Sequence, residues 1–182
     1  MSADAPRQDP DHPTLAAPSP ADRRHLRDCL GRFATGVTIV TACAPDGTLA
    51  GLTVNSFNSL SLEPPLVLWS LGLRASNLPT FLESTHFSVS VLGADQLALA
   101  LRFSRPHADR FEDVPLHAGL GGAPLIAGAL AWFECESLAR HTHGDHVLMI
   151  GAVRRCARTD GPALLFLDGG FGGVRELAPP QA

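Results

Sequence analysis

Polar side chains are concentrated near the end of a predicted strand, in residues 51–59. Hydroxyl and amide groups recur there at Thr53, Asn55, Ser56 and Ser59. A buried strand does not favour this density, because each buried polar group needs a hydrogen-bond partner. The segment is therefore suited to hydrogen-bonding a flat polar ligand. A turn that satisfies its own backbone explains the same composition, and the residues alone leave both interpretations open.

A second polar segment, residues 70–77, directly precedes a predicted short helix at 78–82. It contains Arg74, Ser76 and Asn77. Free N–H groups and the dipole at a helix start attract anions, so this segment is a candidate phosphate site. Ser76 and Asn77 are equally suited to be ordinary N-caps of the helix.

A third segment, residues 141–146, reads His-Thr-His-Gly-Asp-His, which matches the metal-binding signature of metallo-β-lactamase-type hydrolases. Such a zinc site needs further ligands downstream, but no histidine follows His146. A solvated hairpin turn explains His141 and His143, whereas His146 begins an apolar strand. We therefore predict no metal ligands here, and a zinc hydrolase is the weakest of the alternatives.

Composition limits the chemistry and the partners. The net charge of −4 argues against a nucleic-acid or anionic-membrane binder. All 14 basic residues are Arg, which excludes mechanisms built on a lysine amine, and there is no Tyr. No apolar run approaches the ~18 residues of a membrane span. Four widely separated cysteines (Cys29, Cys43, Cys135 and Cys156) predict a reduced, cytoplasmic location with the thiols buried.

One domain of ordinary size is expected in the 182 residues. It spans residues 22–177, between a proline-rich flexible tail at 1–21 and a frayed end at 178–182. Helical spacing of apolar residues begins at Leu26 and ends near Gly36, with a cap signature at Ser19 to Asp22. Further patterns predict helices at 78–82 and 95–103, and strands at 37–41, 49–57, 66–71, 87–91, 130–138, 147–156 and 163–167. This count favours a mainly β barrel with a few helices over a βαβ fold.

Several motifs, taken in order, resemble the short-chain flavin reductase family, which includes the reductase components of two-component flavin monooxygenases. They are LGRFATGVTIVT at 30–41, GLTVNSF at 51–57, SLSLEPPLVL at 59–68, FSVSVL at 87–92, RFS at 102–104 and GDH at 144–146. The similarity covers nearly the whole domain. It implies an FMN-binding split β-barrel, usually a homodimer with the flavin near the subunit interface.

The resemblance also implies roles for individual residues. The isoalloxazine and ribityl chain would be lined by Thr53, Val54, Asn55, Ser56 and Ser59, and the phosphate would be held by Ser70, Arg74, Ser76 and Asn77. Phe103 and Ser104 would approach the cofactor, and His146 would act at the pocket where the nicotinamide stacks. Hydride transfer needs two rings held face to face at about 3–3.5 Å, so positioning without a nucleophile or an amine can carry it.

The expected activity is transfer of a hydride from NADH or NADPH to FMN, or to FAD, with delivery of the reduced flavin to a partner monooxygenase. The alternative is a flavin-dependent oxygenase or flavin-binding protein of secondary metabolism on the same scaffold. Family members commonly carry an Arg and a Tyr in the segment matching 166–171, where this chain has Asp168 and Phe171. That departure affects the expected contacts near the C-terminus.

Overall fold

The computed structural model describes residues 17–19, 22–105 and 109–174. The predicted tail at 1–21 lies almost entirely outside these residues, and the predicted frayed end at 178–182 lies wholly outside them. Within the described ranges, no helix has both the length and the apolar character needed to cross a membrane.

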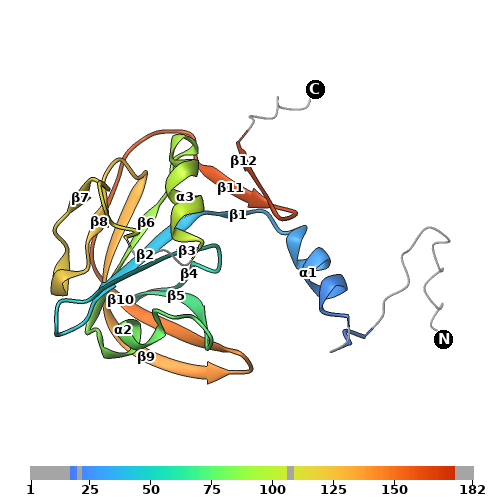
Figure 1. The fold of residues 1–182 in the computed structure, drawn as a ribbon, viewed down its shortest axis with the longest axis horizontal. Helices are drawn as coiled ribbons and strands as arrows, with labels where there is room; N and C mark the ends of the chain where they lie inside the picture. The colour runs from blue at the N-terminus through green and yellow to red at the C-terminus, as the bar shows by residue number, and fades with distance from the viewer. Residues whose placement is uncertain (1–16, 20–21, 106–108, 175–182) are drawn as a thin grey trace, which may run out of the picture.

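The body of the molecule is a seven-stranded antiparallel sheet that curls on itself (Figure 1). In spatial order its strands are β3 (Leu49–Val54), β2 (Thr38–Cys43), β6 (His86–Val91), β9 (Ala131–His143), β10 (His146–Arg158), β5 (Pro65–Gly72) and β4 (Asn58–Leu62). The pairs β2–β3, β4–β5 and β9–β10 are each consecutive in the chain, so they need only short connections. β3 and β4, at the two ends of the order, are not hydrogen-bonded to each other in the described sheet.

The strands bury two apolar clusters. In one, Trp69 of β5 packs edge-on against Phe81 and Phe87, at 5.0 and 5.8 Å between ring centroids. Phe81 belongs to α2 (Leu78–Glu83), which covers this cluster. The other cluster includes Ile39 and Phe103, the latter from α3 (Leu97–Phe103), which follows the 3-10 turn η1 (Ala94–Gln96). Each large side chain buried in this way contributes roughly 1.5–3 kcal/mol.

Short elements complete the molecule. β1 (Thr35–Gly36), β11 (Leu164–Leu167) and β12 (Gly170–Gly173) form a small sheet, and β7 (Leu116–His117) pairs with β8 (Leu125–Ile126) around the 3-10 turn η2 (Leu120–Gly122). The helix α1 (Arg23–Gly31) projects from the barrel beyond β1 (Figure 1). Its N-cap is Asp22, whose Oδ1 accepts a hydrogen bond from the His25 N–H at 3.1 Å.

The predicted helices and strands are present, with shifted ends. The first helix ends at Gly31, before Phe33, and the apolar residues Leu26, Leu30 and Phe33 of the predicted helix are exposed. The strand expected at 49–57 ends at Val54, and a separate strand, β4, follows it.

The link between the two longest strands is shorter than predicted. It consists of Gly144 and Asp145 alone, because Gly144 adopts a positive φ of 59° that allows a two-residue hairpin. His141 and His143 are therefore exposed residues of β9 and not of the turn.

The prediction that the thiols are buried is wrong for two of the four cysteines. Cys135 is buried, Cys43 is half-buried, and Cys29 and Cys156 are exposed. Cys29 lies on the projecting helix, and Cys156 lies in the outer half of β10, where the strand residues are exposed. Burial raises the pKa of the Cys135 thiol to about 12, with a smaller contribution from the charge of Glu134.

Candidate functional site

Two adjoining cavities lie beside the end of β3. The first has a volume of about 250 Å³ and is lined by Val37, Leu52, Thr53, Asn55, Phe103, Ser104, Phe166 and Phe171. The second has a volume of about 290 Å³ and is lined by Leu52, Arg74, Ala75, Ser76, Asn77, Phe103, Ser104, Arg105 and Arg110. Leu52, Phe103 and Ser104 line both, so seven of the predicted site residues surround one connected region.

Gly51 of β3 contacts residues that line these cavities, through its Cα and through its carbonyl. A Cβ at this position would lie 2.7 Å from both the Phe103 and the Phe111 rings, so only glycine allows the rings to pack against the strand. The Gly51 carbonyl accepts hydrogen bonds from Asn77 Nδ2, at 3.3 Å, and from the Arg110 guanidinium. One backbone oxygen thus joins β3 to the start of α2 and to the segment that follows α3.

The hydroxyl groups of Thr53 and Ser104 are already bonded within the fold. Thr53 Oγ1 donates to the Ala100 carbonyl at 2.6 Å, which holds α3 against β3. Ser104 Oγ donates to the Leu101 carbonyl at 2.8 Å at the end of α3. These two hydroxyls can still accept hydrogen bonds from a ligand, because each oxygen keeps free lone pairs.

The start of α2 differs from an ordinary capped helix. Asn77 occupies the N-cap position, but its side chain makes no capping hydrogen bond and donates to Gly51 instead. Arg74 and Ser76 are exposed at the second cavity. Its described lining includes the guanidinium groups of Arg74, Arg105 and Arg110 and no carboxylate. Such a lining favours a phosphate group, which arginine binds through charge-assisted hydrogen bonds.

Four of the predicted binding residues lie outside the two cavities. Ser70 and Ser56 are joined to each other, since the Ser70 N–H donates to Ser56 Oγ at 3.0 Å. Val54 is buried, and its carbonyl accepts a hydrogen bond from Thr38 Oγ1 at 2.9 Å. Ser59 is an exposed residue of β4.

His146 also lies outside the two cavities, at the tip of the β9–β10 hairpin, where it pairs with Gly72 of β5. Its Nδ1 is 2.7 Å from Asp145 Oδ1, and this hydrogen bond is the main cause that lowers the pKa of Asp145. The Leu73 N–H donates to the Asp145 carbonyl at 2.9 Å, which ties the hairpin tip to the segment that carries Arg74 and Ser76.

Sequence reasoning missed Arg105, Arg110 and the ring pair Phe166–Phe171. The two rings lie 5.3 Å apart between centroids, in an edge-on arrangement, and both line the first cavity. Arg110 reaches the site through its bond to Gly51, which is 59 residues away in the chain. The end of a predicted helix beside a polar strand could have suggested Arg105, but no local pattern identifies a contact at such separation.

Asp168, where the family commonly has a different residue, serves the fold. Its N–H donates to the Gly31 carbonyl at 2.9 Å, and its carboxylate forms an ion pair with Arg32. Asp168, the residue that departs from the family pattern, thus joins the end of α1 to the turn between β11 and β12.

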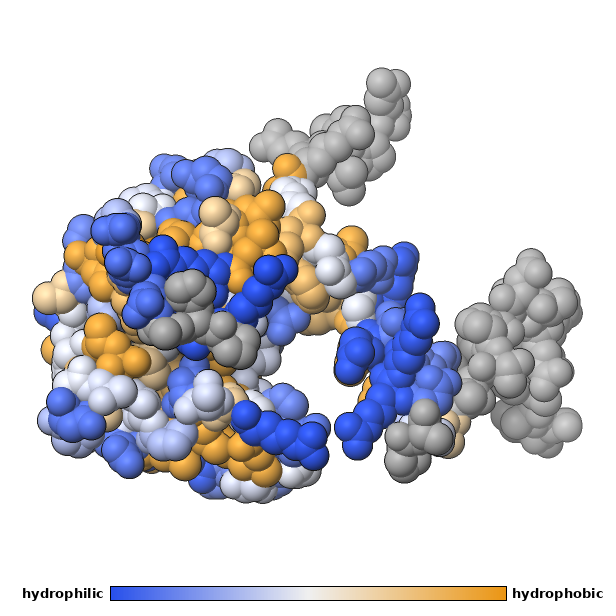
Figure 2. Space-filling view, in the orientation of Figure 1, coloured by the Kyte–Doolittle hydropathy of each residue, from blue (hydrophilic) through white to orange (hydrophobic). Residues whose placement is uncertain are grey.

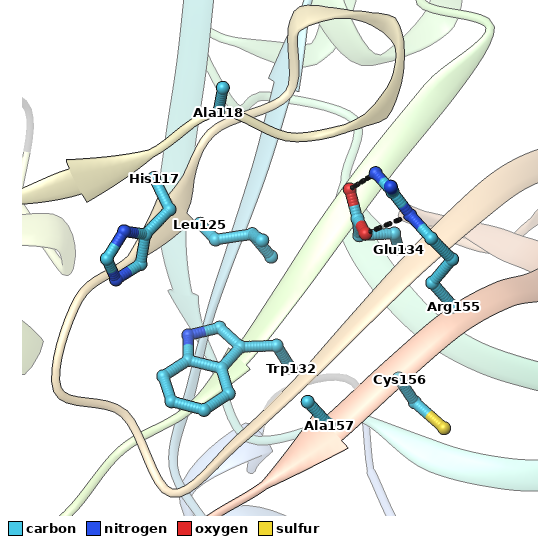
Figure 3. Close-up of a pocket in the computed structure, with 8 residues that line it drawn as sticks. All are labelled: His117, Ala118, Leu125, Trp132, Glu134, Arg155, Cys156 and Ala157. Atoms are coloured by element: carbon cyan, nitrogen blue, oxygen red, sulfur yellow. Dashed lines mark hydrogen bonds and ion pairs between the residues drawn. The ribbon is translucent and has the colours of Figure 1, made fainter.

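Another cavity, of about 450 Å³, lies between the β7–β8 segment and the strands β9 and β10 (Figure 3). Glu134 faces Arg155 there, with Arg155 Nε 2.6 Å from Glu134 Oε2, and Glu134 also accepts the Leu120 N–H at 2.8 Å. Both oxygens of the carboxylate thus have partners within the fold, and Arg155 offsets its charge. Over residues 17–19, 22–105 and 109–174, no three His, Cys, Asp or Glu side chains are grouped so that they could hold a metal ion.

The structure is an antiparallel barrel left open between β3 and β4, a split barrel, and the aromatic cavity beside the basic one suits the ring and the phosphate of a planar phosphorylated ligand. Residues 30–175 match the family described as "Flavin reductase like domain", and the chain belongs to that family. The expected fold class, a mainly β split barrel with a few helices, is confirmed.

Known relatives are similar over most of the chain. An FMN reductase (NADH) of Agrobacterium fabrum is 48% identical over 155 residues, which cover 85% of this chain and 88% of the relative. The reductase component of a flavin-dependent trigonelline monooxygenase of Acinetobacter baylyi is 39% identical over 83% of this chain, but the match covers only 46% of that longer protein. The solved structure of an NADH:FAD oxidoreductase of Streptomyces globisporus, in complex with NAD and FAD fragments, is 38% identical with a TM-score of 0.80, covering 92% of this chain and 100% of the other.

Proposed function

We propose that this chain is an NADH-dependent flavin reductase that supplies reduced flavin to a partner monooxygenase. The observation that carries the proposal is the pair of adjoining cavities, one aromatic and bordered by a polar strand end, the other basic. Membership of the flavin reductase family and the similarity to named flavin reductases support it.

The residues present fit FMN. The rings of Phe103, Phe166 and Phe171 offer an apolar wall for an isoalloxazine, while Thr53 and Asn55 offer polar groups at its edge. In the adjoining cavity, Arg74, Arg105 and Arg110 provide the positive charge that a phosphate monoester needs, and Ser76 provides a hydroxyl. The two cavities meet at Leu52 and Phe103, as the ring and the phosphate of one ligand require.

The chain contributes binding and orientation to the reaction. When bound, the flavin supplies the redox chemistry by accepting a hydride from the nicotinamide. The Gly51 carbonyl accepts hydrogen bonds from Asn77 and Arg110. These bonds fix the residues that line the two cavities relative to one another. Thr53 and Ala100 keep α3 against β3, so that the Phe103 ring cannot move away from the strand.

Several finer points belong to the same proposal. His146 would approach the nicotinamide from the tip of the β9–β10 hairpin, with its ring oriented by Asp145. The chain would act as a cytoplasmic homodimer, a role for which exposed apolar residues such as Phe33 and Leu62 are suited. Residues 1–21 would be a dispensable tail and residues 22–177 the catalytic domain.

The proposal is tested by mixing the purified chain with NADH and FMN under anaerobic conditions and following absorbance at the nicotinamide and flavin bands. We expect one NADH oxidised for each flavin reduced, and we expect titration of FMN to quench its fluorescence. Absence of both flavin binding and NADH oxidation would contradict the proposal. Flavin binding without turnover would instead favour the flavin-dependent oxygenase or binding protein.

A further inference from the structure

We propose that the cavity between the β7–β8 segment and the strands β9 and β10 binds a small aromatic carboxylate, with the carboxylate at Arg155 and the ring against Trp132. The site takes a second ligand, separate from the flavin, and it does not depend on flavin reduction. No described residue lines both this cavity and either of the two beside β3. β7 and β8 also lie on the side of the barrel opposite α1 (Figure 1), and Figure 2 shows an open gap between α1 and the barrel.

The apolar part of this cavity has a fixed geometry. Trp132 Nε1 donates to the carbonyl of Ile126, a buried residue of β8, at 2.7 Å. This hydrogen bond holds the indole beside Leu125, between His117 on one side and the Glu134–Arg155 pair on the other (Figure 3). An indole held in this way offers a surface on which an aromatic ring can pack. The volume of about 450 Å³ falls within the range of about 300–1,000 Å³ of cavities that bind small organic molecules.

Arg155 uses only one edge of its guanidinium within the fold. Its Nε lies 2.6 Å from Glu134 Oε2, and its Nη2 donates to Glu134 Oε1 at 2.8 Å. Nη1 has no hydrogen-bond partner among the described residues, and the Arg155 side chain is 59% exposed. The guanidinium carries five N–H donors in a planar fork, so it can bind one carboxylate on each edge. The edge formed by Nη1 and Nη2 is therefore suited to the carboxylate of a ligand.

Glu134 holds Arg155 ready for this contact. The Glu134 side chain is only 9% exposed and also accepts the Leu120 N–H at 2.8 Å, so the backbone fixes the carboxylate that fixes the guanidinium. A donor oriented in advance loses less freedom when a ligand binds. Among the described residues no carboxylate other than Glu134 lines the cavity, so an incoming anion meets no unpaired negative charge. An inorganic anion would leave the indole surface uncovered, whereas an aromatic carboxylate satisfies both the ring and the charge.

The test uses 2-naphthoate as the probe and measures its binding to the full chain by calorimetry. The titration is made with and without saturating FMN, and we expect the same affinity in both, because the probe and the flavin occupy separate cavities. The matched probe is 2-naphthamide, which has the same rings without the charge. We expect 2-naphthamide to bind about tenfold more weakly than 2-naphthoate, since it cannot form the charge-assisted pair with Arg155.

Three variants locate the probe. A lysine in Arg155→Lys keeps a positive charge for Glu134 but lacks the second edge of the fork, so we expect 2-naphthoate to bind about fivefold more weakly and 2-naphthamide to bind unchanged. Trp132→Leu removes the indole surface and should weaken both probes by similar factors. Arg158→Gln is the control, because Arg158 is on the same strand and is 84% exposed but does not line the cavity. If a variant fails to fold, the comparison of the two probes on the wild-type chain still decides, because it needs no substitution.

Several results would overturn the proposal. The first is the absence of 2-naphthoate binding, or equal affinities of the two probes for the wild-type chain. Release of FMN by 2-naphthoate, or loss of 2-naphthoate binding at saturating FMN, would place the probe in the flavin cavities instead. Equal affinities of 2-naphthoate for the wild-type chain and Arg155→Lys would place the carboxylate elsewhere. A chain that binds 2-naphthoate as expected but neither binds nor reduces FMN would count against the proposed function alone.

Discussion

Substitution of Ser76 distinguishes the two explanations of the segment before α2, a phosphate site and an ordinary helix N-cap. It lines the basic cavity, while the neighbouring Asn77 occupies the N-cap position without capping. We expect Ser76→Ala to weaken FMN binding by about 1–2 kcal/mol, the scale of one hydrogen bond to a charged phosphate, and to leave turnover at saturating flavin nearly unchanged. Fluorescence titration measures the Kd. A lower free energy of unfolding with an unchanged Kd would show that Ser76 serves the helix only.

His146 separates the nicotinamide and metal interpretations of the histidine-rich segment. We expect His146→Ala to lower kcat/KM for NADH about tenfold, equivalent to about 1.4 kcal/mol, with the FMN Kd unchanged. His141→Ala and His143→Ala are the matched controls, because both residues are exposed on β9. Steady-state kinetics and elemental analysis decide the question together. Stoichiometric zinc, lost equally in all three variants, would refute the nicotinamide role, since each ligand completes the same coordination sphere.

At the scale of the elements, β9 and β10 depend on a glycine. A Cβ on Gly151 would lie 2.3 Å from the Phe87 ring and 2.9 Å from Cys135 Cβ, and the strand pairing is irregular between Ile150 and Gly151. We expect Gly151→Ala to reduce the free energy of unfolding in urea by about 1–3 kcal/mol or more, because the buried ring must move away. The control is Gly172→Ala in β12, where nothing lies within 4 Å of the added methyl. Equal stability of the two variants would show that the core accommodates the clash.

The elements that could be predicted are those whose apolar residues follow a local period. β2, β6 and α3 are of this kind: β2 is a short run rich in β-branched residues, Phe87, Val89 and Val91 of β6 alternate with serines, and apolar residues recur along α3. β4 could not be found in this way: its residues are exposed apart from Ser61, and it exists through its pairing with β5. The two-residue strand β1 likewise depends on a partner more than a hundred residues away along the chain.

The same distinction holds for the candidate site. The polar groups of Thr53, Asn55 and Ser76 could be found because each belongs to a compact segment with an unusual composition. Arg110 and Phe171 become site residues only when β3, the segment after α3 and β12 are brought together. The residues adjacent to Arg110 and Phe171 in the chain give no pattern that predicts these long-range contacts.

At the scale of the whole molecule, apolar side chains remain on the surface of the single chain. Leu62 of β4 is 90% exposed and Phe33, just after α1, is 74% exposed. β4 is also an edge strand of the seven-stranded sheet, with backbone groups available for pairing. Large exposed apolar residues beside a projecting helix and on an edge strand are typical of an interface between subunits.

We therefore expect a dimer in solution, with a mass twice the 19.2 kDa of one chain by light scattering. Leu62→Asp should shift the protein toward the monomer, because a charge at an interface loses its hydration without gaining a partner. Leu49→Asp is the control, since Leu49 is only 41% exposed and lies on the β2–β3 hairpin. If the flavin lies near the interface, Leu62→Asp should also weaken FMN binding at low protein concentration, and added protein should restore it. A wild-type mass of one chain at every concentration would exclude the dimer, and a Leu62→Asp dimer as stable as the wild type would place its interface elsewhere.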